Sequence, residues 1–138
     1  MPNRSRGIVA SSGIMRSLRS PTAARIVAGS FALSGVIHFA RPTVFRPLIP
    51  RRLPQPDVWI YASGAAELVC AAGLFANQRW ARPASVALLL GVWPGNATYA
   101  VRVSKKKGVG STASVIGWAR MPMQIPLIMA VWPTESRG

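Results

Sequence analysis

The chain has 138 residues, of which 50% are hydrophobic, and its 17 Lys and Arg face only 3 acidic residues, giving a formal net charge of +14. No ordinary soluble domain combines these features. A basic protein that binds nucleic acid arranges its apolar residues in amphipathic stripes, whereas here they form long blocks with Arg and Lys mostly between them. We therefore expect no nucleic-acid partner, and the pattern is typical of a membrane protein with spans and loops.

The N-terminal segment, residues 1–21, holds four arginines among Ser, Gly and Pro. We expect a basic, disordered tail outside the bilayer. Its composition also suits a signal or transit peptide. However, no cleavage site with small residues follows the next apolar run, so we interpret that run as a retained span. Met15 is an alternative start of the chain.

The first apolar run, about residues 22–39, approaches the ~20 residues that cross the hydrocarbon core of a bilayer. The next segment, residues 40–56, contains five prolines and four arginines, which excludes a regular helix crossing the membrane. Its apolar residues, among them Phe45 and Leu48, predict an interfacial loop whose side chains dip into the headgroup region. The second span, about residues 57–76, is rich in Ala, Gly and Ser, which let membrane helices approach closely.

A short turn leads to the third span, about residues 80–101, so spans two and three should be antiparallel neighbours. Residues 102–116 contain three consecutive lysines and predict a flexible basic loop. The fourth span, about residues 117–132, includes Pro122 and Pro126, which we expect to interrupt it. The prediction is an all-α, polytopic membrane four-helix bundle formed by residues 22–133 as a single domain after the tail.

The two sides of this topology carry equal numbers of Lys and Arg, so the positive-inside rule does not decide the orientation. The first span often dominates orientation, and the tail before it is strongly basic. We therefore predict that both termini are cytoplasmic.

Ionisable residues inside spans are costly and mark candidate functional sites. Glu67 lies about ten residues into the second span, or ~15 Å, which is near the bilayer midplane. Because alternate spans run in opposite directions, the other polar span residues fall in the half that faces residues 40–56 and 102–116. The sequence predicts a polar pocket opening to that side with Glu67 at its floor, and the candidate members are His38, Ser63, Glu67, Asn96, Tyr99, Arg120 and Gln124.

Each candidate also has a structural interpretation. We expect Glu67 and Arg120 to interact directly or through one water, either to hold the helices together or as part of a substrate or proton site. His38 is either a hydrogen-bonded structural histidine or a ligand. The WPGN sequence at residues 93–96 predicts a kink whose freed carbonyl is met by a neighbour.

The residue inventory provides no complete catalytic or metal-binding signature. A single histidine cannot supply the paired axial ligands of a membrane haem, and the lone Cys70 can form neither an intrachain disulfide nor an iron–sulfur site. No catalytic residue and no metal ligand is assigned.

Four motifs follow one another in a characteristic order: SGVIHFARPTVFRPLIPRRLP, YASGAAELVCAAGLF, LLLGVWPGNATYAV and WARMPMQIPLIMAVW. Over about residues 24–132, the chain resembles the DoxX-like family of small four-helix bacterial membrane proteins. The basic tail lies outside this resemblance. The residues that carry it are Gly35, His38, Phe39, Pro42, Pro50, Ser63, Gly64, Glu67, Pro94, Asn96, Arg120, Pro122 and Gln124.

The resemblance implies a component of the bacterial cytoplasmic membrane, linked in some relatives to redox complexes that include thiosulfate:quinone oxidoreduction and oxidative-stress assemblies. The expected function is a non-catalytic subunit or anchor of a quinone-linked complex; an enzymatic role would be that of an accessory subunit. Expected partners are anionic lipid headgroups, an oxidoreductase and a second copy of the chain, with a quinone as the ligand. The alternative is a small proton-coupled transporter or channel-like protein that uses Glu67, although neither an inverted repeat nor a second intramembrane carboxylate supports it.

Overall fold

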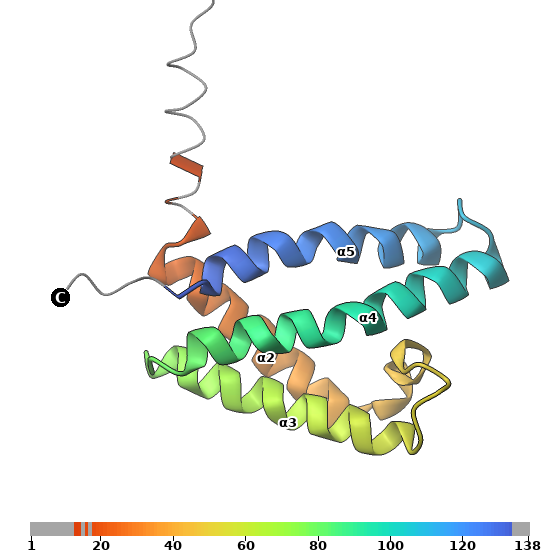
Figure 1. Ribbon diagram of the computed structural model, residues 1–138, viewed down its shortest axis with the longest axis horizontal. Coiled ribbons are helices and arrows are strands. Elements are labelled where there is room, and N and C mark those ends of the chain that lie inside the picture. Colours follow the sequence, from red (N-terminus) through yellow and green to blue (C-terminus); the bar gives the residue numbers. More distant parts are fainter. Residues whose placement is uncertain (1–12, 15, 17, 134–138) are drawn as a thin grey trace, which may run out of the picture.

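The computed structural model describes residues 13, 14, 16 and 18–133. Most of the basic tail predicted for residues 1–21 lies outside these residues. In chain order, the elements are α2 (Pro21–Ala40), two short 3₁₀ turns η1 (Pro42–Val44) and η2 (Arg46–Leu48), α3 (Pro56–Phe75), α4 (Ala81–Lys107) and α5 (Thr112–Val131) (Figure 1). No strand occurs in the described part of the chain. The all-α prediction is confirmed.

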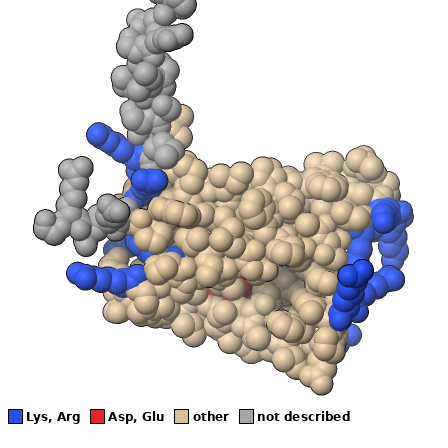
Figure 2. All heavy atoms as spheres, viewed as in Figure 1, with Lys and Arg blue, Asp and Glu red and all other residues tan. Residues whose placement is uncertain are grey.

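All four long helices are long and apolar enough to cross a membrane. Their outer surfaces expose large apolar side chains, including Leu33, Val69, Leu90 and Ile125. A soluble protein rarely exposes so much contiguous apolar surface, whereas lipid accommodates it. On the face that Figure 2 shows, Lys and Arg gather at the two ends of the molecule, and the surface between them carries neither. The lengths, composition and surface all fit a membrane protein.

The boundaries of α4 and α5 differ from the prediction. Helix α4 continues to Lys107 and α5 begins at Thr112, so the loop predicted for residues 102–116 shrinks to residues 108–111. Lysines are good helix formers, and their charge is favourable at a helix C-terminus. Gly108 then ends α4 with a φ of 85°, and Ser111 caps α5 by accepting a hydrogen bond from the Ser114 amide at 3.3 Å.

The prolines of α5 do not interrupt it. Pro122 and Pro126 both lie inside the continuous helix Thr112–Val131. Each proline removes one backbone donor, but proline is tolerated in membrane helices when neighbouring groups satisfy the freed carbonyls. The fourth span is therefore a full-length helix.

Helix α2 packs mainly against α3 and α4 mainly against α5, while the α3–α4 and α2–α5 contacts are less extensive. Glycines permit the close approach. A Cβ added at Gly35 would lie 3.0 Å from the Gly64 carbonyl oxygen, and one added at Gly117 would lie 3.1 Å from the Ala100 Cα. The interfaces thus follow the rule that small residues bring membrane helices together.

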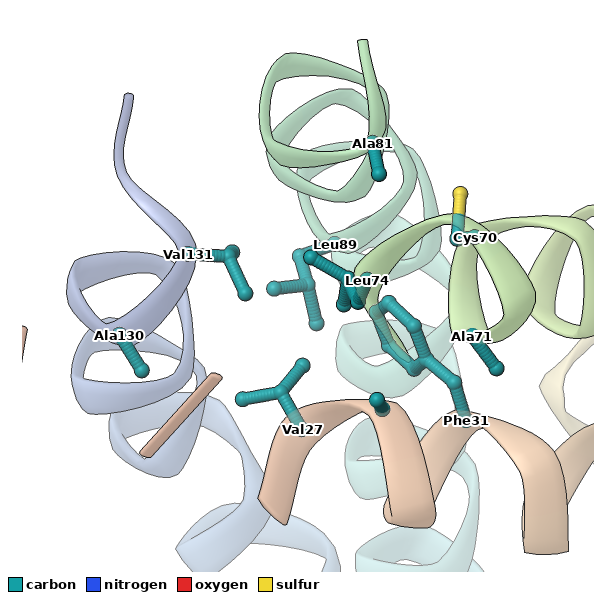
Figure 3. Packing of buried hydrophobic residues seen from close by; sticks show 10 residues of the cluster. Val27, Phe31, Cys70, Ala71, Leu74, Ala81, Leu89, Ala130 and Val131 are labelled. Carbon is teal, nitrogen blue, oxygen red and sulfur yellow. The ribbon is translucent and has the colours of Figure 1, made fainter. Parts of the chain in front are cut away.

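The buried apolar cluster lies where the start of α2, the end of α3, the start of α4 and the end of α5 meet (Figure 3). Many of its side chains are small, and the free Cys70 packs among them. The cluster occupies one half of the molecule and leaves the other half for the polar site. Its members are Val27, Ala28, Phe31, Cys70, Ala71, Leu74, Ala81, Leu89, Ala130 and Val131.

Candidate functional site

A buried pair of ionisable side chains joins α2 to α3. His38 lies in the last turn of α2 and is 6% exposed, and Glu67 lies in α3 and is 8% exposed. The His38 Nδ1 is 3.3 Å from the Glu67 Oε2 and 2.8 Å from the Ser34 carbonyl oxygen. A carbonyl oxygen can only accept, so the short distance to Ser34 requires a hydrogen on Nδ1.

This arrangement leaves one atom of each side chain available. The single Nδ1 hydrogen is directed to Ser34, and Glu67 Oε2 then has no hydrogen-bond partner among the described residues. The His38 Nε2 likewise makes no hydrogen bond to that part of the chain. Buried polar atoms are normally satisfied, so the buried Glu67 Oε2 and the free His38 Nε2 are where a ligand, a water or a proton would act.

The His38 ring is clamped between the loop and α3. The Phe45 ring, which lies between η1 and η2, stacks on it with ring centroids 3.5 Å apart and an interplanar angle of 15°. On the α3 side, the His38 Cβ fills the space that a Gly64 side chain would need, because a Cβ there would lie 2.5 Å away. The ring orientation is therefore fixed by packing.

The loop that carries Phe45 is itself anchored to α3 and α4 through the two residues that follow Phe45. Arg46 donates two hydrogen bonds to the Asp57 carboxylate, at 3.1 and 3.0 Å, and Arg102 donates to the Pro47 carbonyl oxygen at 2.9 Å. The loop also rests on α4, where a Cβ at Gly95 would lie 3.2 Å from the Leu48 carbonyl oxygen. The proline-rich segment is therefore a lid packed on α3 and α4, and Phe45 and Leu48 turn toward the protein.

Beneath this lid lies a cavity of about 220 Å³. His38 and Ser63 contribute its polar side chains, and the remaining walls are aliphatic or aromatic. Its volume is smaller than the ~300–1,000 Å³ typical of sites that enclose a whole small molecule. The cavity can accommodate one ring-sized group, and the lining residues are His38, Phe45, Leu48, Ile49, Pro50, Leu53, Trp59, Ile60, Ser63, Gly91, Val92, Pro94 and Gly95.

Arg120 does not pair directly with Glu67, contrary to that part of the prediction. Among the described residues, Arg46 pairs with Asp57, and His38 lies against Glu67 and forms an ion pair with it when the imidazole is protonated. Arg120 is exposed, and its guanidinium carbon lies 5.9 Å from the centre of the Tyr99 ring. The reason is the order of helices: α3 packs against α2 and α4, and it makes little contact with α5. Arg120 and Glu67 were paired because of their similar predicted depth, but they lie on helices that are not neighbours.

Gln124 and Asn96 also lie apart from the pair. The Gln124 side-chain amide donates to the Leu89 carbonyl oxygen at 3.0 Å, and its Oε1 has no partner among the described residues. The sequence predicted that a neighbour would bond the carbonyl freed by Pro94, which is the carbonyl of Leu90. Gln124 instead bonds the carbonyl of Leu89, the residue before it. Asn96 is partly buried and makes no side-chain hydrogen bond to the described residues.

Residues 27–135 match the family described as a domain of unknown function, DUF8561. This range covers more than half of the chain and includes every candidate site residue. The chain belongs to the DUF8561 family. Comparisons with curated proteins and with solved structures find no match. The family description gives no activity, so the resemblance to DoxX-like proteins stays a prediction.

In this DUF8561 chain, sequence reasoning identified His38, Ser63 and Glu67, which the structure brings together, but missed the lid. Phe45 and Leu48 were predicted to dip into the headgroup region, yet both line the cavity, together with Trp59 of α3. A signal was present in WPGN, because a glycine in a span beside a proline permits close approach of another backbone. That approach is made by Leu48 on Gly95.

Proposed function

We propose that this DUF8561 chain crosses the membrane as a four-helix bundle and binds the ring of a quinone-like molecule in the cavity beside His38. In this role it is a non-catalytic membrane subunit or anchor of a redox complex. The observation that carries the proposal is that His38, which is paired with the buried Glu67, lines a largely apolar cavity of ring size, while the Glu67 Oε2 has no hydrogen-bond partner among the described residues.

The chemistry of the cavity fits a quinone head group. Such a ring is flat and apolar on its faces and has polar oxygens at opposite edges. Phe45, Trp59 and Ile60 provide apolar walls, and aromatic side chains favour stacked rings. The quinone oxygens accept hydrogen bonds and the quinol hydroxyls donate them, and His38 Nε2 can do either because imidazole exchanges protons near neutral pH.

The size of the cavity supports a ligand that is only partly enclosed. About 220 Å³ admits a ring but not a long hydrocarbon chain. The tail of a lipid-soluble quinone would remain in the bilayer, which surrounds the exposed apolar faces of the helices. Electron transfer to or from the ring needs a redox partner, and the DoxX-like resemblance supports an oxidoreductase in that role.

The proposed location is the bacterial cytoplasmic membrane with both termini on the cytoplasmic side. Pro21 at the start of α2 and Pro133 just after α5 line one cavity, which is separate from the cavity beside His38. The two ends of the helical domain therefore lie at one end of the molecule. An even number of spans produces this arrangement. The basic segment before α2 supports the cytoplasmic assignment.

The proposal is tested by titrating the detergent-purified full chain with decylubiquinone while tryptophan fluorescence is followed, since Trp59 lines the cavity. Ser63→Leu fills the cavity but leaves the His38–Glu67 pair in place, and we expect it to weaken binding by about tenfold or more. Ser30→Leu is the matched control, because Ser30 is exposed on α2. Quenching that does not saturate, or that is equal in all three proteins, would contradict the proposal.

A second candidate, a proton-coupled transporter, is favoured by one observation. Glu67 Oε2 is buried without a hydrogen-bond partner in the described part of the chain, and an intramembrane carboxylate of this kind is typical of proton relays. Proton uptake into liposomes that contain no quinone, lost in Glu67→Gln, would support transport. If this proton uptake were observed and decylubiquinone caused no saturable change in fluorescence, the transporter would replace the subunit as the proposed function.

A further inference from the structure

A second cavity, of about 280 Å³, lies at the opposite end of the molecule from the lid. Three arginines line it, and each comes from a different segment: Arg25 from α2, Arg79 from the turn between α3 and α4, and Arg82 from α4. The cavity shares no lining residue with the one beside His38. An inference about it is therefore independent of the proposed quinone site.

Two of these arginines, Arg25 and Arg82, lie where positive charge lowers the stability of a helix. Arg25 and Arg82 lie near the N-termini of α2 and α4, and neither helix has an acidic residue in its first turn. A cation at this end opposes the helix macrodipole. By contrast, the lysines 105–107 lie at the C-terminus of α4, where the dipole favours positive charge and no ligand is needed to explain them.

No carboxylate among the described residues offsets this charge. The acidic residues in that part of the chain are Asp57, which is bonded to Arg46, and Glu67, which lies beside His38. Two helix N-termini and three guanidinium groups therefore surround one cavity with positive potential. This combination favours phosphate, because the positive ends of helix dipoles attract an anion and the forked N–H groups of Arg match phosphate oxygens.

Further donors line the same cavity. The side-chain amides of Asn77 and Gln78 belong to its wall. Helix α4 begins without a side-chain cap. In its first turn the Ala81 and Ala84 amides donate to the Gln78 and Trp80 carbonyl oxygens and Pro83 has no N–H, so the Arg82 amide is the one left to bond an anion. Arg82 donates to the Ala130 carbonyl oxygen at 3.4 Å, and this contact positions its guanidinium while other N–H groups remain available.

The cavity lies at the level expected for lipid headgroups. Trp80 and Trp132, which are 47% and 49% exposed, stand next to its lining segments at this end of the molecule. Exposed tryptophans concentrate at the boundary between hydrocarbon and water. We propose that this cavity binds a phosphate group of net negative charge, carried by an anionic phospholipid headgroup or by a soluble phosphate.

The test measures the thermal stabilisation of the detergent-purified full chain by dioctanoyl phosphatidylglycerol, dioctanoyl phosphatidylcholine and inorganic phosphate. The variant is Arg25→Gln with Arg79→Gln, since both side chains are exposed and their loss should leave the fold intact. The matched control is Lys105→Gln with Lys107→Gln, which removes the same charge at the opposite end. Each protein is compared with its own midpoint without ligand.

We expect saturable stabilisation by phosphatidylglycerol that is about tenfold weaker in the arginine variant and unchanged in the lysine variant. Saturation by inorganic phosphate with the same dependence on the arginines would identify a soluble phosphate as the ligand, and its absence would identify the lipid. If phosphatidylglycerol stabilised both variants equally weakly, the stabilisation would depend on the net charge of the protein and not on the three arginines, and the proposal would be overturned. Equal stabilisation by phosphatidylcholine would also overturn it.

Discussion

His38→Gln is expected to lower the free energy of unfolding by about 3–5 kcal/mol, the range found when one partner of a buried ion pair is removed. Glu67 is 8% exposed, and its Oε2 has no hydrogen-bond partner among the described residues. Without the imidazole 3.3 Å away, the carboxylate is left alone in an apolar interior. Unfolding of the detergent-solubilised variants by sodium dodecyl sulfate measures the change.

The double variant His38→Gln with Glu67→Gln completes a thermodynamic cycle. It should be milder than His38→Gln alone, because no buried charge is left unpaired, and the coupling should lie in the ~0.5–3 kcal/mol range of contacting residues. The exposed Arg46–Asp57 pair, whose side chains are 54% and 47% exposed, is the control. Its removal should cost about 1 kcal/mol or less. Additive effects at His38 and Glu67 would show that the two side chains do not interact.

Gly64→Ala is expected to lower the free energy of unfolding by about 1–3 kcal/mol, as overpacking of a close interface does. The added Cβ would lie 2.5 Å from the His38 Cβ and 3.2 Å from the Phe39 ring, so α2 and α3 must move apart. This movement would also shift the His38 ring from its stack with Phe45. The same unfolding measurement applies, and weaker decylubiquinone binding should accompany the loss of stability.

Gly29→Ala provides the matched control for this substitution. A Cβ at Gly29 would meet no atom within 4 Å, and alanine is the better helix former by about 1 kcal/mol. The control should therefore be neutral or slightly stabilising. A Gly64→Ala protein as stable as the Gly29→Ala protein would show that α2 and α3 do not pack through Gly64.

The sequence was sufficient to predict four helices and where the polar residues lie along them, but not the bounds of α4 and α5 or which helices are neighbours. Hydrophobic blocks and prolines located all four spans, and counting from the start of α3 placed Glu67 in its middle. Depth alone, however, leaves the direction around the helix axis open. For this reason Arg120 was paired with Glu67, although α5 packs against α4 and the actual partner is His38 on α2.

The lid illustrates a second limit. Residues 40–56 are basic and rich in proline, which predicts a loop correctly but does not say whether its apolar side chains face lipid or protein. Phe45 and Leu48 turn inward because His38 offers a ring face and Gly95 offers a surface without a side chain. Gly95 is far from Leu48 in the sequence, and His38, although only seven residues before Phe45, lies on α2 outside the loop, so the pattern of residues 40–56 could not indicate either contact. The extension of α4 to Lys107 was missed because a run of lysines resembles a loop when its helix propensity is ignored.

The most direct test of the ligand-binding account is the quinone content of the chain purified from its native membrane. Organic extraction followed by mass spectrometry should find an isoprenoid quinone in near-stoichiometric amount with the wild-type protein and with Ser30→Leu. The same extraction should find almost none with Ser63→Leu, in which the cavity beside His38 is filled. Phospholipid without quinone in the wild-type extract, or equal quinone in all three proteins, would contradict the account.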